Sequence, residues 1–171
     1  RLFRVCKVGV PFFLFLTKAN CTFFVLLISS FDQRGNFDEA GELFRNLIVI
    51  YKRKYGDAHP LLGSAHHNLG VVYLGADRHE DALDSFLQAV RVRKRLAIAK
   101  GKGNPDVAIS LVKMGVCNLL LKRFDDALVA FDEALAIRQR SLGELHPSTA
   151  RVLNNIGCVH VEFAWYPQAS K

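Results

Sequence analysis

Residues 123–127 read RFDDA, and nearly the same segment stands twice earlier in the chain, as RHEDA at 78–82 and NFDEA at 36–40. YPQA at 166–169 is a fourth, weaker copy. The alanines that end the four copies are 42, 45 and 42 residues apart: Ala40, Ala82, Ala127 and Ala169. A period of this length is typical of a repeat protein, in which similar units stack against one another.

Each unit is predicted to contain two helices. The first begins at a proline, because proline suits the first helical position, where its missing N–H is not needed. These prolines are Pro60, Pro105 and Pro147. The second begins near the repeated acidic residue and alanine, and its spacing places Ala82, Phe86 and Ala89 on one face. No segment alternates apolar and polar residues as a half-buried strand does.

Two sets of glycines repeat with the same period. One set lies within the first helices, where a missing side chain lets the neighbouring helix approach closely: Gly70, Gly115 and Gly157. The other set lies four residues before each proline, where a helix end favours a left-handed residue: Gly56, Gly101 and Gly143. Both sets support paired helices.

This pattern of glycine, alanine, phenylalanine and proline resembles the tetratricopeptide repeat. Its long form, of about 42 residues with an HP turn between units, is similar to the repeats of kinesin light chains, above all in ALAIRQRSLGELHPSTARVLNNIGCV, residues 134–159. The resemblance covers residues 31–171 and implies an all-α fold, a right-handed superhelical solenoid of antiparallel helix pairs. We expect an excerpt of a longer array, with its last unit incomplete. The expected units are 21–59, 60–104, 105–146 and 147–171.

Residues 1–30 form a separate apolar segment, for which three interpretations stay open. A degenerate first helix fits Leu27 and Phe31, which keep the apolar positions of the family. A signal or membrane anchor fits the apolar composition, although Pro11 and Lys18 interrupt the run. The third interpretation is a gene-model artefact that replaces an upstream repeat.

Composition favours a packed domain without a strong nucleic-acid signature. Half of the 171 residues are apolar and 11% are aromatic. The net charge of +7 includes four basic residues and no acidic residue in 1–30, so 31–171 hold 19 basic and 16 acidic residues. Binding to nucleic acid needs phosphate-neutralising charge over a face, which this balance does not supply. The basic run RVRKRLAIAKGK at 91–102 is interpreted as a solvated helix end. This interpretation is preferred to a nuclear import signal or a phosphate contact.

The sequence predicts neither an enzyme nor a cofactor or metal site. His66 and His67 are adjacent, so on a helix they point about 100° apart and cannot hold one ion together. No H-x-x-x-H, C-x-x-C or G-x-x-x-x-G-K spacing occurs. The cysteines are expected to be reduced, with Cys117 and Cys158 buried in apolar helical surroundings.

A peptide-binding ladder is predicted on the concave surface that the first helices line. Two residues before the glycine within each first helix stand Asn68, Lys113 and Asn155. Six before it stand Ser64 and Arg151, and three before it stand His67 and Asn154. A side-chain amide offers both a donor and an acceptor, so asparagines here can hold the backbone of an extended peptide, and the cations can attract acidic residues.

The resemblance to kinesin light chains implies the same use of this surface. These proteins bind cargo peptides through asparagines and basic residues in their groove. Asn68 and Asn155 match that pattern, and Lys113 departs from it. We therefore expect a non-catalytic, cytoplasmic scaffold for a protein or peptide partner, an acidic one in particular, with no small-molecule substrate. The alternatives are a regulatory or sensory array of a larger signalling enzyme, an RNA-binding repeat protein, and a membrane-tethered adaptor that depends on residues 1–30.

Overall fold

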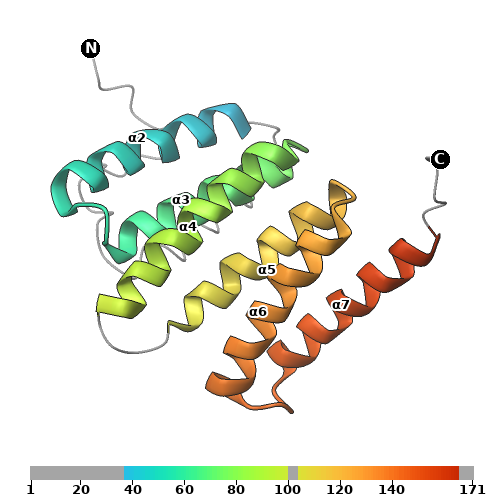
Figure 1. The fold of residues 1–171 in the computed structure, drawn as a ribbon. Coiled ribbons are helices and arrows are strands. Elements are labelled where there is room, and N and C mark those ends of the chain that lie inside the picture. The colour runs from blue at the N-terminus through green and yellow to red at the C-terminus, as the bar shows by residue number, and fades with distance from the viewer. Residues whose placement is uncertain (1–36, 100–103, 166–171) are drawn as a thin grey trace. The chain divides into compact units, whose positions relative to one another are not determined.

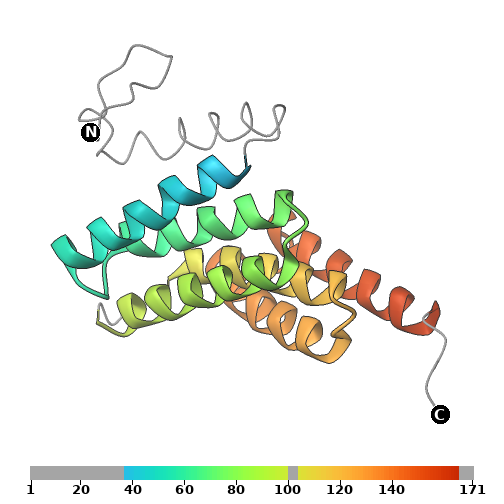
Figure 2. The ribbon, with the colours of Figure 1, turned by 90° about the horizontal axis from the view of Figure 1, so that it is seen from above.

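The computed structural model describes residues 37–99 and 104–165, and within these ranges every regular element is a helix. The helices are α2 (Phe37–Tyr55), α3 (Pro60–Gly75), α4 (His79–Ala99), α5 (Pro105–Leu120), α6 (Phe124–Leu142) and α7 (Pro147–Trp165). They lie side by side in chain order, each packed mainly on the next (Figure 1). In the view turned by 90°, α3 lies between α2 and α4 (Figure 2). The predicted all-α repeat solenoid is confirmed.

The first helix of each unit begins at its predicted proline. The residue before the proline accepts a hydrogen bond from a backbone N–H of the first turn, which has no partner inside the helix. His59 Nδ1 accepts from the N–H of Leu61 at 3.3 Å, and Asn104 Oδ1 accepts from the N–H of Asp106 at 3.0 Å. His146 Nδ1 does the same for Ser148 at 3.1 Å. The HP and NP pairs are therefore helix caps.

Glycine and phenylalanine pack against each other inside each complete pair of helices. A methyl group added at Gly70 would lie 2.8 Å from the ring of Phe86, and one at Gly115 would lie 2.6 Å from the ring of Phe131. Both rings are fully buried. The predicted close approach of the two helices is confirmed at these glycines. At Gly157 no atom of the described residues lies within 4 Å of the added methyl group.

The turns between units also follow the glycine pattern. Gly56 has a φ of +78° and Gly143 a φ of +88°, which residues with a side chain rarely adopt. Each follows the last turn of a helix, α2 in one case and α6 in the other. The third predicted turn glycine, Gly101, lies outside the described residues.

The predictions for residues 1–30, and for the first helix of the unit at 21–59, also lie outside the described residues. In the ranges that the structure covers, no helix combines the length and the apolar character needed to span a bilayer. The helix pairs α3–α4 and α5–α6 fall within the expected units 60–104 and 105–146.

Candidate peptide-binding face

The predicted ladder residues lie at equivalent positions on the three first helices. Helix α3 carries Ser64, His67 and Asn68, α5 carries Lys113, and α7 carries Arg151, Asn154 and Asn155. We call the surface formed by Ser64, Asn68, Lys113, Arg151 and Asn155 the first-helix face. Arg151 is exposed and the other four are half-buried.

The polar groups of the first-helix face are not used within the described fold. The amides of Asn68 and Asn155 make no side-chain hydrogen bond to another described residue, and Ser64 makes none either. Neither Lys113 nor Arg151 has a carboxylate partner in the described part of the chain. Asn154 differs, because its Nδ2 lies 4.0 Å from Cys158 Sγ. The face therefore presents donors, acceptors and positive charge to an incoming ligand.

His67 is the one ladder residue that has a polar partner in another unit. Its Nδ1 lies 3.1 Å from Ser110 Oγ, and its ring centre lies 5.3 Å from that of Phe86. Burial, helped by the charges of Arg93 and Lys113, lowers the pKa of His67 to about 3. The imidazole is therefore neutral near pH 7 and serves the contact between units. Its predicted contact with a peptide stays a prediction.

Comparison with known proteins identifies the repeat. The family model of the tetratricopeptide repeat matches residues 25–95 and 106–171. The chain belongs to the tetratricopeptide repeat family. Repeats of this kind build protein-interaction scaffolds, and the predicted resemblance is confirmed.

Two curated relatives illustrate the range of proteins that contain similar repeats. The protein KINESIN LIGHT CHAIN-RELATED 2 of Arabidopsis thaliana is 28% identical over 122 residues, which are 70% of this chain and 18% of the relative. The clustered mitochondria protein homolog of Ajellomyces capsulatus (strain NAm1 / WU24) is 24% identical over 130 residues, which are 76% of this chain and 10% of the relative. This tetratricopeptide repeat chain thus spans less than a fifth of the length of either relative.

Two solved structures share the fold. BtubC (BKLC) from P. vanneervenii has a TM-score of 0.69 at 23% identity, over 85% of this chain and 57% of that chain. Nearly identical TPR-like repeats attributed to a kinesin light chain of Podosopora anserina have a TM-score of 0.68 at 19% identity. That match covers 81% of this chain and 64% of the other. The tetratricopeptide repeats described here are thus similar in fold to those of kinesin light chains.

A buried arginine joins successive units of the tetratricopeptide repeat array. Arg93 in α4 is only 7% exposed, and its Nη1 donates to the backbone oxygen of Asp106 at 2.8 Å and to Ser110 Oγ at 2.6 Å. One unit later, Arg138 Nη1 donates to the backbone oxygen of Ser148. Asp106 and Ser148 each follow the proline that begins a first helix.

The interpretation of residues 91–102 as a solvated helix end is therefore wrong for Arg93. This arginine faces α5, and a backbone carbonyl together with a hydroxyl replaces the water that its guanidinium would otherwise bind. The sequence held a signal for this role, since Arg93 and Arg138 stand 45 residues apart, in step with Ala89 and Ala134.

The expectation of buried thiols is correct for Cys117 and wrong for Cys158. Cys117 is buried, and burial raises the pKa of its thiol to about 11, against a smaller opposing effect of Lys113. Cys158 is exposed, whereas Val71 and Val116, which stand at the same helix position in the earlier units, are half-buried. Among the described residues, no group of three His, Cys, Asp or Glu side chains is placed to hold a metal ion.

Proposed function

We propose that this chain is a non-catalytic scaffold that binds an extended peptide of a cytoplasmic partner protein on the first-helix face. The observation that carries the proposal is the pair of amides, Asn68 and Asn155, that no described residue uses. They stand at the same helix position in units separated by one further unit, and Lys113 holds that position between them.

The chemistry of an extended peptide fits this arrangement. Its backbone presents N–H and C=O groups at regular intervals, and each asparagine can satisfy one of each whatever the peptide side chains are. Lys113 and Arg151 add positive charge on the same face, so acidic peptides should bind more tightly than neutral ones.

A peptide array probed with the full 171-residue chain tests the proposal. The hits are then titrated against the double variant Asn68→Ala, Asn155→Ala. Replacing each asparagine should cost about 1 kcal/mol of binding free energy, so the double variant should bind about 30-fold more weakly. Asn46→Ala is the matched control, because Asn46 is an exposed asparagine on α2, away from this face.

The proposal fails if the double variant and the control bind the hits equally well while both keep the helical circular dichroism of the parent. Repeating the titrations at two salt concentrations separates the contribution of Lys113 and Arg151, because salt screens exposed charges. A peptide whose affinity does not change with salt, but falls when both asparagines are replaced, would show that the amides alone provide the site.

A further inference from the structure

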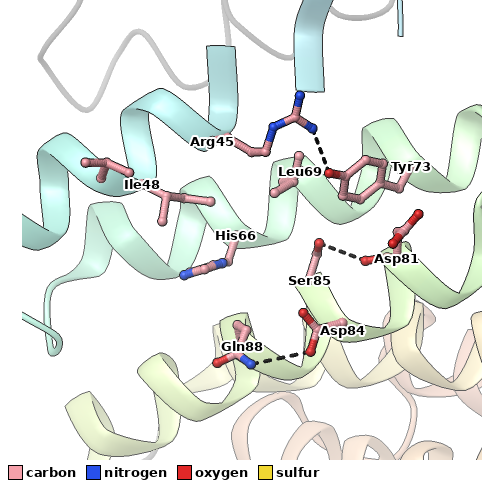
Figure 3. A pocket seen from close by; sticks show the side chains of 10 residues that line it. Arg45, Ile48, His66, Leu69, Tyr73, Asp81, Asp84, Ser85 and Gln88 are labelled. Carbon is pink, nitrogen blue, oxygen red and sulfur yellow. Dashed lines mark hydrogen bonds between the residues drawn. The ribbon is translucent and has the colours of Figure 1, made fainter. Parts of the chain in front are cut away.

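A hollow of about 410 Å³ opens between α2 and α4, with α3 as its floor (Figure 3). Ile48 on α2 and Leu69 on α3 give it an apolar lining. At one end Arg45 Nη1 donates to the hydroxyl of Tyr73 at 2.8 Å. Asp81 and Asp84 of α4 also line it.

A second hollow, of about 310 Å³, adjoins the first, because His66 and Gln88 line both. Its walls carry three cations, Lys52, Arg91 and Arg95, and one carboxylate, Asp57. Neither arginine has a carboxylate partner among the described residues. Lys52 Nζ lies 3.3 Å from Asp57 Oδ1, but both side chains are at least 60% exposed, and an ion pair so exposed is easily exchanged. We call the two hollows together the α2–α4 site.

The next junction of the array, between α4 and α6, shows what the α2–α4 site lacks. Lys94 stands at the position of Lys52, and its Nζ lies 2.6 Å from Oε1 of Glu133 on α6. This ion pair links the two helices across the junction. Gln88 stands where Glu133 does, and its amide donates to Asp84 Oδ1 in its own helix at 3.4 Å instead.

The floor of the two junctions differs as well. Leu111 of α5, which aligns with His66 of α3, is fully buried. His66 takes the corresponding place in α3 and is half-buried, and burial lowers its pKa. Glutamine in place of glutamate thus leaves Lys52 without a carboxylate from the opposite helix, and a half-buried histidine takes the place of a buried leucine.

We propose that the α2–α4 site binds a peptide segment of a partner protein in which an acidic residue neighbours an apolar one. The partner's carboxylate takes the place that Glu133 holds in the next junction and contacts Lys52, Arg91 and Arg95. Its apolar side chain enters the hollow between Ile48 and Leu69. Asp84 at the apolar end repels a carboxylate, so the charges also set the direction of the peptide.

This site is separate from the first-helix face. His66 and Asn68 are two residues apart on α3, so their side chains point about 160° apart around the helix axis. A ligand of the α2–α4 site therefore does not depend on Asn68 or Asn155, and the two sites can be tested independently.

The test uses the full chain and a fluorescein-labelled peptide that carries Leu-Asp-Glu between glycine and serine flanks. The control peptide carries Leu-Asn-Gln in the same flanks. Fluorescence anisotropy gives the affinity, and amide chemical-shift changes in the ¹⁵N-labelled chain locate the site. We expect shifts in α2, α3 and α4 around His66 and Gln88, and at least fivefold weaker binding of the neutral peptide.

Two variants sharpen the test. Gln88→Glu supplies a carboxylate opposite Lys52, as in the next junction, and should weaken binding of the acidic peptide at least fivefold. Arg95→Gln should do the same by removing one cation. Arg140→Gln is the matched control, because Arg140 stands at the position of Arg95 one unit later and is also exposed. It should leave the affinity unchanged.

Three results would overturn the inference. The first is equal affinity for the parent and Gln88→Glu. The second is a set of shifts confined to residues near Asn68 and Asn155, which would instead support the proposed function. The third is no binding of the acidic peptide up to about 1 mM.

Discussion

Arg93 Nη1 lies 2.6 Å from Ser110 Oγ, across the boundary between one repeat unit and the next. The serine oxygen accepts from the guanidinium, so its own hydrogen is free to bond His67 Nδ1 at 3.1 Å. Three helices, α3, α4 and α5, are joined by this contact. Burial lowers the pKa of Arg93, yet an arginine stays protonated in a folded protein, so the contact holds a full charge.

Removal of Arg93 should weaken the array more than removal of a neighbouring arginine. Arg93→Ala leaves the Ser110 hydroxyl and the Asp106 carbonyl without this donor, which should lower the free energy of unfolding by about 2 kcal/mol. Arg91→Ala, on the exposed side of the same helix, should change it by less than about 0.5 kcal/mol. Urea unfolding followed by circular dichroism measures both, and equal losses would refute the role of Arg93.

Acid should destabilise the array through His67. Its pKa is lowered to about 3 in the folded chain from an ordinary 6.5, so the unfolded chain binds the extra proton and stability falls as the pH drops from 6.5 toward 3. Between pH 7.5 and pH 5 this residue should remove about 2 kcal/mol. His67→Gln should show a smaller loss over the same range. A pH dependence identical in the parent and in His67→Gln would contradict the prediction.

The repeated glycines should respond differently to the same substitution. Gly115→Ala places a methyl group 2.6 Å from the buried ring of Phe131, so we expect a loss of about 2 kcal/mol. Gly157→Ala meets no described atom within 4 Å, so the better helix propensity of alanine should raise stability by about 0.5–1 kcal/mol. Thermal unfolding of the two variants gives the comparison. A similar shift of Tm in both would rule out the packing explanation.

The two described cysteines should react at very different rates. With a pKa of about 11 only about one Cys117 thiol in a thousand is ionised at pH 8, and the side chain is also buried. Cys158 is exposed and open to reagent. Brief treatment of the native chain with iodoacetamide, followed by peptide mass spectrometry, should find Cys158 modified and Cys117 intact. Rapid labelling of Cys117 without denaturant would show that the core opens readily.

Local rules were sufficient to predict most of the fold from the sequence. The helix starts at Pro60, Pro105 and Pro147 and the packing of Gly115 on Phe131 follow from the preferences of single residues and the repeat period. Lys113 stands at the helix position of Asn68 and Asn155, as predicted, but whether these side chains bind a peptide stays a prediction.

Features that depend on two units at once were missed. The burial of Arg93 requires the first turn of α5, which a basic run considered by itself does not reveal. The α2–α4 site depends on the difference between Gln88 and Glu133, two residues that align across units but face different neighbours. Which contacts a side chain makes at such a position can be predicted only when the neighbouring helix is known.

The contact among Arg93, Ser110 and His67 also restricts how the units can be ordered. At the following junction the positions of His67 and Ser110 are held by Val112 and Val152. If residues 105–146 were deleted, His67 would face Val152, which offers its ring nitrogen no hydrogen bond. The units are therefore not interchangeable modules. An engineer who shortens, duplicates or permutes this array has to keep together the two units whose residues meet at each junction.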